Sequence, residues 1–130
     1  MKKILIALSF LAIALTGCSS GENSAISNVS PKEFAEVISN QEVQVIDVRL
    51  PEEYQAGHLE NAQLISVEAA DFEQKISALD KTRTYAVYCR SGRRSTIATE
   101  KMAELGFTNL VNLQGGFEDL ANLGLGVKVG

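Results

Sequence analysis

One cysteine of this chain lies in a segment that could turn it into a nucleophile. The segment reads CRSGRRS and covers residues 89–95. A β-branched and aromatic run at residues 84–88 predicts a buried strand before it, and residues 95–105 predict a helix after it. Ligands of open α/β sheets bind at the carboxyl ends of strands, where loop amides and the next helix N-terminus favour anions. The thiol of Cys89 is therefore expected to have a lowered pKa and to serve as a catalytic nucleophile.

The residues after Cys89 predict a cradle for an anionic substrate. Gly92 allows backbone dihedral angles that a Cβ atom would resist, and three arginines bring positive charge. The predicted substrate-binding residues are Arg90, Ser91, Gly92, Arg93 and Arg94. A buried structural cysteine followed by a solvated basic turn is the alternative, and these residues alone leave it open.

The elements that must position this loop alternate between strand and helix. Predicted strands cover residues 43–48, 62–66, 84–88 and 110–113, and predicted helices cover residues 51–56, 72–79, 95–105 and 117–122. A further helix is expected to begin at Pro31 with Ser30 as its N-cap, and to end at Asn40. This alternation predicts an α/β domain with a mostly parallel sheet and helices on both faces.

The N-terminus has the pattern of an export signal. Lys2 and Lys3 precede an apolar run at residues 4–15, which is too short to span a bilayer comfortably. The run ends in Leu15-Thr16-Gly17-Cys18, which resembles the bacterial lipobox. The resemblance implies a lipoprotein signal peptide at residues 1–17, lipid attachment to Cys18, and anchoring of the exported protein to the bacterial cell envelope, on the periplasmic side or the outer face of the membrane. An ordinary signal peptide with a stray cysteine and a short membrane anchor are the alternatives.

The composition limits the remaining possibilities. The 130 residues leave room for one domain, predicted at residues 29–130 after a flexible polar tether at residues 18–28. Removal of residues 1–17 takes away two lysines and leaves 10 basic against 16 acidic residues, a charge of −6 that argues against nucleic acid as a partner. Two cysteines and one histidine are too few for a zinc site of the usual kind, so neither a metal nor another cofactor is expected. A monomer is preferred, although the sequence leaves the oligomeric state open.

Three segments together resemble the rhodanese family. They read DVRLPEEYQAGHLENA at residues 47–62, CRSGRRS at residues 89–95, and LQGGF at residues 113–117. Their order and spacing are similar to the family over residues 29–123, and the small exported single-domain members of the phage-shock protein E type look most similar. Leu59, Asn61 and Phe117 depart from the usual pattern. The resemblance implies a rhodanese-like domain with a mostly parallel five-stranded sheet.

The resemblance also implies a reaction. The Cys89 thiolate would take the outer sulfur of a small anionic donor such as thiosulfate, hold it as a persulfide, and pass it to a thiophilic acceptor such as cyanide or a thiol. Arg90 and Arg93 would orient the donor, and Arg94 would tie the loop to its surroundings. Asp47 and Arg49 are predicted supporting residues, preferably a structural hydrogen-bonded pair. His58 is given a structural role.

Three other functions compete with sulfur transfer. Rhodanese-related phosphatases resemble Cys-x5-Arg, whereas here the sixth position after Cys89 is Ser95 and Arg94 stands at the fifth, which favours sulfur transfer. Some rhodanese-like modules only bind partners, but these often lack the cysteine. Thiol–disulfide exchange is disfavoured because a lipidated Cys18 leaves Cys89 without a resolving cysteine in the chain.

Overall fold

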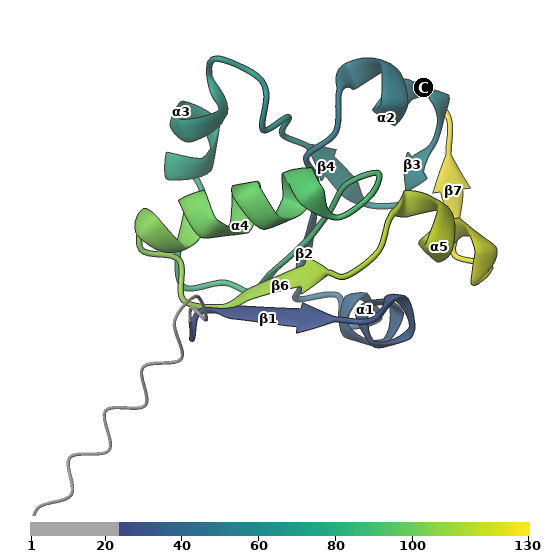
Figure 1. The fold of residues 1–130 in the computed structure, drawn as a ribbon, viewed down its shortest axis with the longest axis horizontal. Helices are drawn as coiled ribbons and strands as arrows, with labels where there is room; N and C mark the ends of the chain where they lie inside the picture. Colours follow the sequence, from purple (N-terminus) through teal and green to yellow (C-terminus); the bar gives the residue numbers. More distant parts are fainter. Residues whose placement is uncertain (1–23) are drawn as a thin grey trace, which may run out of the picture.

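A parallel sheet of five strands forms the centre of the computed structural model, which describes residues 24–130 (Figure 1). The strands lie in the order β1-β6-β5-β2-β4, and every neighbouring pair is parallel. Their bounds are β1 Ile26–Val29, β2 Gln44–Asp47, β4 Ala62–Leu64, β5 Tyr85–Tyr88 and β6 Leu110–Leu113. The central strand β5 is buried along its whole length, as expected for a strand covered by helices on both faces.

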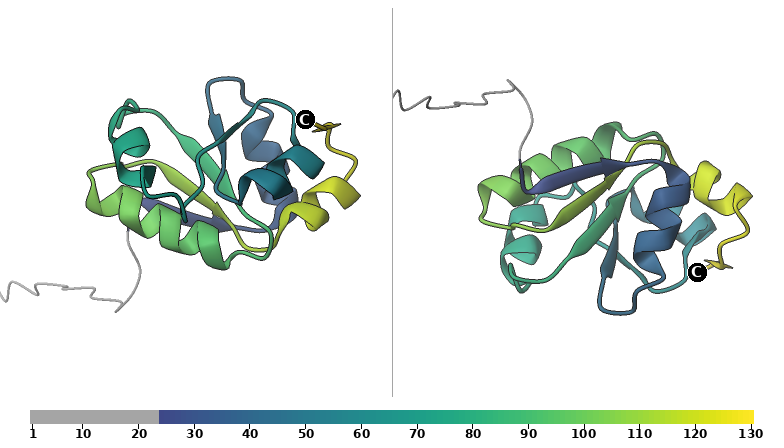
Figure 2. Two further views of the ribbon diagram at one scale, coloured as in Figure 1. Left: turned by 90° about the horizontal axis from the view of Figure 1, so that it is seen from above. Right: turned by 90° about the horizontal axis from the view of Figure 1, so that it is seen from below.

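Five helices cover the two faces of the sheet. Their bounds are α1 Pro31–Ile38, α2 Pro51–Ala56, α3 Phe72–Ser77, α4 Arg93–Glu104 and α5 Phe117–Asn122. One buried cluster joins α3 and α4 to the sheet through residues such as Ile76 and Met102, and a second joins α1 and α5 through residues such as Phe34 and Leu120. Both views of Figure 2 show α4 and α1 on opposite sides of the sheet. The prediction of an α/β domain with a parallel five-stranded sheet and helices on both faces is confirmed.

The start of α1 follows the predicted capping signal. Ser30 Oγ accepts a hydrogen bond from the Glu33 amide at 3.2 Å and donates one to Glu33 Oε1 at 3.0 Å, while Pro31 occupies the first helical turn. The helix ends at Ile38, two residues before the predicted end at Asn40. Phe34 is fully buried between this helix and the sheet.

The predicted tether extends too far into the domain. Residues 26–28 belong to strand β1, which pairs with β6 in the register Ile26↔Leu110. Ile26 and Val29 are half-buried, whereas Ser27 and Asn28 are exposed. An edge strand this short and polar has almost no apolar periodicity, and long-range pairing with β6 is what makes it a strand.

Other element boundaries also differ from the predictions. Helix α4 begins at Arg93 instead of residue 95, so two of the loop arginines belong to its first turn, and α3 ends at Ser77 instead of residue 79. A second sheet was not predicted: β3 (His58–Leu59) pairs with β7 (Val127–Lys128) in the antiparallel sense. Strands of two residues carry no periodicity from which they could be predicted.

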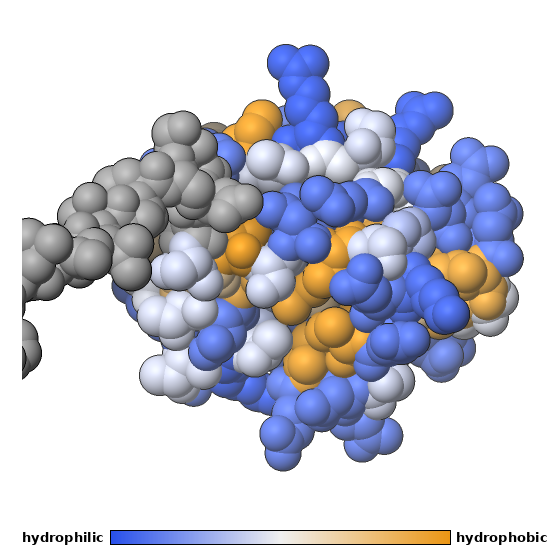
Figure 3. Space-filling view, turned by 60° about the horizontal axis from the view of Figure 1, so that its bottom comes forward, coloured by the Kyte–Doolittle hydropathy of each residue, from blue (hydrophilic) through white to orange (hydrophobic). Residues whose placement is uncertain are grey.

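The predicted signal peptide at residues 1–17, the lipidation site Cys18 and tether residues 18–23 lie outside the described residues. Within residues 24–130, none of the helices has the length and apolar character needed to traverse a bilayer. On the face shown in Figure 3, apolar residues form small patches among hydrophilic ones.

Candidate active site

The loop after β5 lies at the carboxyl edge of the sheet, where several connections meet. Strand β5 ends at Tyr88, Cys89 follows immediately, and α4 begins at Arg93 (Figure 1). The turn into the helix depends on Gly92, whose φ of +95° lies in the left-handed region that side chains disfavour. Strand β6 ends at the same edge, and the turn after it packs against this loop.

The sulfur of Cys89 is buried and receives hydrogen bonds from the loop. The Gly92 amide donates to Sγ at 2.9 Å, and Ser95 Oγ lies 3.6 Å from it. Burial raises the pKa of the Cys89 thiol, but hydrogen bonds from the Ser95 side chain and from the amides of Ser95, Ser91 and Gly92 outweigh it, so the pKa is lowered overall. The arrangement therefore favours a thiolate, the form that acts as a nucleophile.

A second turn holds the loop from the other side. The Phe117 amide donates to the Cys89 carbonyl at 2.9 Å, which fixes the backbone of Cys89 itself. Gly116 lies so close to the loop that a Cβ atom there would overlap the Arg90 carbonyl oxygen. The Gly-Gly turn after β6 is thus a packing partner of the active-site loop.

Arg94 is bound to α2 by a bidentate ion pair. Its Nη1 donates to Glu53 Oε1 at 2.6 Å and its Nη2 donates to Glu53 Oε2 at 2.9 Å. The hydrogen bonds from Arg94 lower the pKa of Glu53, and Glu53 raises the pKa of Arg94. This pair ties the first turn of α4 to the segment after β2.

Asp47 and Arg49 form a buried ion pair at the end of β2. Arg49 Nη2 lies 2.6 Å from Asp47 Oδ2 and also donates to the Gly57 carbonyl at 2.6 Å. Burial lowers the pKa of Arg49, but the charge and hydrogen bonds of Asp47 outweigh it and the pKa is raised. The guanidinium also lies over the Phe117 ring, 4.2 Å from its centroid. The pair thus connects β2, the end of α2 and the start of α5 beneath the site.

A chain of hydrogen bonds runs from the edge strand to the loop. Asn112 Nδ2 donates to Asn28 Oδ1 at 2.9 Å and to Thr96 Oγ1 at 3.2 Å. Thr96 Oγ1 in turn donates to the Gly92 carbonyl at 2.7 Å. Asn112 is buried in β6, and its Oδ1 has no hydrogen-bond partner among residues 24–130, an arrangement that costs free energy. We infer that Asn112 and Thr96 hold Gly92, whose amide reaches the sulfur.

A cavity of about 470 Å³ lies beside the loop. Its walls come from α2, from Arg90 and Ser91 of the loop, and from Phe117 and Glu118 of α5. Arg90 and Arg93 are both exposed, and no ion pair involves either of them within residues 24–130. The charge of Arg90, which lines the cavity, is available to an anion bound there.

The predicted site residues of the domain meet at one edge of the sheet. The structure places Cys89, Arg90, Ser91 and Gly92 in the loop, and Arg93 and Arg94 in the first turn of α4. His58 is buried, and its ring stacks on the ring of Tyr54 with 3.6 Å between the centroids. Its Nδ1 lies 2.8 Å from the Tyr54 carbonyl oxygen, so the surroundings of His58 are those of a packed structural residue. Groups of three or more metal-ligating side chains are absent from the described part of the chain.

Several residues that support the site were not predicted from the sequence. They are Glu53, Ser95, Thr96, Asn112 and Gly116. The only signal for any of them was their place inside the three segments quoted above, which contain Glu53, Ser95 and Gly116. Thr96 and Asn112 lie outside those segments, and only the fold brings them together.

Comparison with known proteins gives consistent matches. Residues 30–123 match the family described as "Rhodanese-like domain". The chain is 40% identical over 78 residues to the thiosulfate sulfurtransferase PspE of Escherichia coli strain K12, covering 58% of this chain and 72% of that protein. It is 34% identical over 91 residues to a probable adenylyltransferase/sulfurtransferase, MoeZ, of Mycobacterium tuberculosis, covering 69% of this chain but only 23% of that protein. A solved structure described as a rhodanese with anions from E. coli superimposes with a TM-score of 0.57 at 35% identity, covering 68% of this chain and 99% of that one.

Proposed function

Because this chain belongs to the family of rhodanese-like domains, we propose that it is a sulfurtransferase that carries sulfur on Cys89 as a persulfide. The observation that carries the proposal is the hydrogen bond from the Gly92 amide to the buried Sγ of Cys89, together with the lowered pKa of that thiol. These features suit a nucleophile whose charge must be stabilised both before and after it has gained a sulfur atom.

The reaction has two halves. In the first, the Cys89 thiolate attacks the outer sulfur of thiosulfate or a similar donor; an S–S bond forms to Sγ, the S–S bond of the donor breaks, and sulfite leaves with the electron pair. In the second, an acceptor thiolate or cyanide attacks the outer sulfur, and the bonding electrons return to Cys89 as a thiolate. The exposed Arg90 and Arg93 attract the anionic donor, while the loop amides stabilise the persulfide anion.

The geometry disfavours phosphate hydrolysis. The bidentate pair with Glu53 already uses one N–H from each of Nη1 and Nη2 of Arg94, the arginine at the fifth position after the nucleophile. A tetrahedral phosphate would have to compete with Glu53 for this guanidinium. We therefore expect little or no hydrolysis of aryl phosphates beside measurable sulfur transfer.

The test is to follow the mass of the protein after treatment with thiosulfate. The wild-type protein should gain one sulfur atom on Cys89 and should release thiocyanate when cyanide is added. Cys89→Ser should abolish both, with a loss of about 1,000-fold or more in rate. Cys18→Ala is the matched control, since it removes the other cysteine of the chain and should leave both reactions unchanged. A Cys89→Ser protein that transfers sulfur at the wild-type rate would refute the proposal.

We also propose that the domain is held at the bacterial cell envelope by lipid on Cys18. The support is the sequence Leu15-Thr16-Gly17-Cys18 after a short apolar run. Cys18→Ala should abolish metabolic labelling with fatty acid and leave an unprocessed precursor. Continued labelling of that variant would contradict the lipid anchor without affecting the proposed chemistry at Cys89.

A further inference from the structure

The cavity beside the loop is larger than a small inorganic donor requires. Thiosulfate has five heavy atoms, whereas the cavity measures about 470 Å³ and falls within the size range of pockets for organic ligands. Part of its wall is apolar, from Ala56 of α2 and from Phe117 and Ala121 of α5. The volume and the apolar wall both suit a ligand with a carbon skeleton.

Four charged side chains line this cavity, and two of them, Arg49 and Glu53, are already neutralised by ion pairs. Arg49 is paired with Asp47, and Glu53 is paired with Arg94. The other two are Arg90 and Glu118, which are exposed and take part in no ion pair within the part of the chain that the structure describes. The cavity therefore offers one available positive charge from the loop and one available negative charge from the first turn of α5.

We propose that this cavity binds the sulfur acceptor, and that the acceptor is a small organic thiol carrying both a carboxylate and an ammonium group. This inference rests on the proposed function, because it names the substrate of the second half-reaction. Arg90 receives the carboxylate, Glu118 receives the ammonium group, and the carbon skeleton lies against Phe117. Cyanide, which has neither a skeleton nor a positive charge, gains nothing from Phe117 or Glu118.

The transfer balances without any further reactant. The acceptor thiol loses its proton to solvent, and its thiolate attacks the outer sulfur of the Cys89 persulfide. A new S–S bond forms on the acceptor, the S–S bond to Sγ breaks, and its electron pair stays on Cys89. The acceptor leaves as a persulfide, and the loop amides again hold a thiolate.

The experiment measures the second half-reaction alone. The protein is loaded to completion with thiosulfate, freed of donor, and mixed with one of four thiols: cysteine, which is zwitterionic, cysteamine, which is cationic, 3-mercaptopropionate, which is anionic, and 2-mercaptoethanol, which is neutral. The rate constant for loss of the persulfide is recorded for each thiol. Each thiol is compared only between variants, because the four differ in intrinsic reactivity.

The variants separate the two charges. Glu118→Gln should slow transfer to cysteine and cysteamine by about two- to fivefold and leave the other two thiols unchanged, the size expected of an exposed charge pair. Arg90→Gln should slow cysteine and 3-mercaptopropionate by a similar factor. Glu100→Gln is the matched control: it removes an exposed carboxylate on α4 that does not line the cavity, and it should change none of the four rates.

Equal effects of Glu118→Gln on all four thiols, or no effect on any, would overturn the inference. This outcome differs from failure of the proposed function, in which loading with thiosulfate would leave no persulfide to measure. High salt should reduce the difference between wild type and Glu118→Gln for cysteine, because screening weakens the same interaction.

Discussion

The carboxyl edge and the amino edge of the central sheet both have cavities, but polar groups suited to catalysis gather at the carboxyl edge. The carboxyl edge has the cavity of about 470 Å³ lined by Arg90 and Ser91 of the loop that follows Cys89. The amino edge has two cavities of about 380 Å³ each, one lined by Gln44 and Glu60 among others and one lined by Arg83 and Thr84 among others. Cavity volume therefore does not distinguish a site from a surface depression in this molecule.

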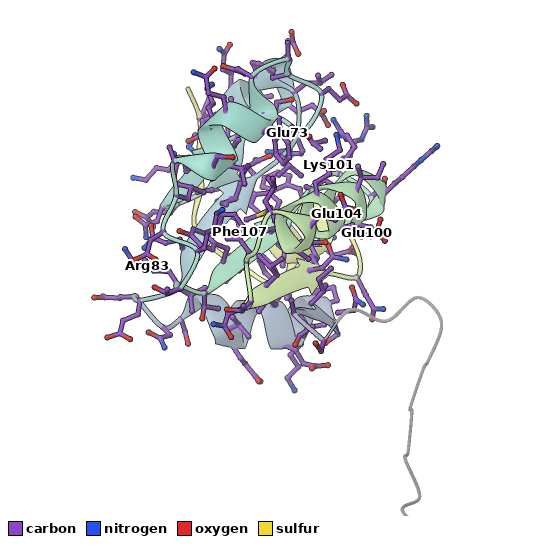
Figure 4. The ribbon with its side chains drawn as sticks, turned by 90° about the vertical axis from the view of Figure 1, so that its left-hand side faces the viewer. Glu73, Arg83, Glu100, Lys101, Glu104 and Phe107 are labelled. Atoms are coloured by element: carbon purple, nitrogen blue, oxygen red, sulfur yellow. The ribbon has the colours of Figure 1, made fainter. Side chains whose placement is uncertain are left out.

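The difference lies in how polar groups are arranged at each edge. At the carboxyl edge, amides of the loop converge on one sulfur atom, and the buried Asp47–Arg49 pair lies at the end of β2. Figure 4 looks onto the amino edge, where Arg83 lies on the opposite side from Glu100 and Glu104. The physical reason is the direction of the chain: loops at the carboxyl edge lead into helix N-termini, which present N–H groups, whereas loops at the amino edge leave helix C-termini, which present carbonyls.

Breaking the buried pair should have the largest effect on stability. Asp47→Asn leaves the buried Arg49 guanidinium without a counter-charge, and we expect the free energy of unfolding to fall by about 3–5 kcal/mol in chemical denaturation. The double variant Asp47→Asn with Arg49→Met removes the unpaired charge and should recover part of this loss. A double variant no more stable than Asp47→Asn would show that the cost has another origin.

Two glycines provide the next comparison between the edges. Gly116→Ala forces a Cβ atom against the Arg90 carbonyl, and we expect a loss of about 1–3 kcal/mol in unfolding free energy. Displacement of the loop should also slow persulfide formation by up to about 100-fold. Gly106, at the turn between α4 and β6 on the amino edge, has a φ of +100°, and an added Cβ atom would meet no atom of another described segment closer than Lys81 Cδ at 3.7 Å. Gly106→Ala should therefore cost some stability and leave persulfide formation unchanged. Equal losses of activity in both variants would contradict the special role of the carboxyl edge.

The pH dependence of stability gives a smaller effect. Arg94 lowers the pKa of Glu53 in the folded protein, so their pair stabilises the fold above the ordinary pKa of a glutamate, and this contribution is lost as the pH falls through the lowered value. Glu53→Gln should reduce the unfolding free energy by about 1 kcal/mol at pH 7, and the difference from wild type should shrink in acid.

Asp80→Asn is the comparison at the amino edge. Hydrogen bonds from Thr82 lower the pKa of Asp80, so the sign of the pH dependence is the same, but this carboxylate is fully exposed to solvent. We expect its effect on unfolding to be smaller than that of Glu53→Gln at every pH. Denaturant titrations of the three proteins between neutral and acid pH measure both differences.

The smallest expected effect tests the hydrogen-bond chain behind the loop. Thr96→Val removes the hydroxyl that donates to the Gly92 carbonyl, so the Gly92 amide should be held less well against the sulfur. The pKa of Cys89 should rise toward its ordinary value, and alkylation of the thiol below that pKa should slow by about two- to fivefold. Thr96→Ser keeps the hydroxyl and should restore the profile of rate against pH. Thr82→Val removes a hydroxyl bound to Asp80 on the amino edge and should not move that profile.

Much of the fold was predictable because the signals are local. The buried run of β5 and the strand β6 at residues 110–113 follow from short apolar segments, and α2 and α5 occur where the sequence predicted them. Strand β1 was not predictable, because the polar residues Ser27 and Asn28 separate its two half-buried apolar residues and leave no apolar periodicity. Its pairing partner β6 also lies far along the chain. Local sequence patterns do not predict an element that forms only because it pairs with a strand distant in the sequence.

The sequence by itself determined that Cys89 lies at the carboxyl end of a buried strand, which the structure ends one residue earlier, at Tyr88, that a glycine- and arginine-rich turn follows Cys89, and that a helix begins after this turn. These are properties of one continuous segment. Only the tertiary structure decided that Arg94 binds Glu53, 41 residues earlier, and that Asn112 binds both Asn28, 84 residues earlier, and Thr96. Contacts between distant segments depend on strand order and register, which no short stretch of sequence contains, because they result from how all the elements bury their apolar faces together.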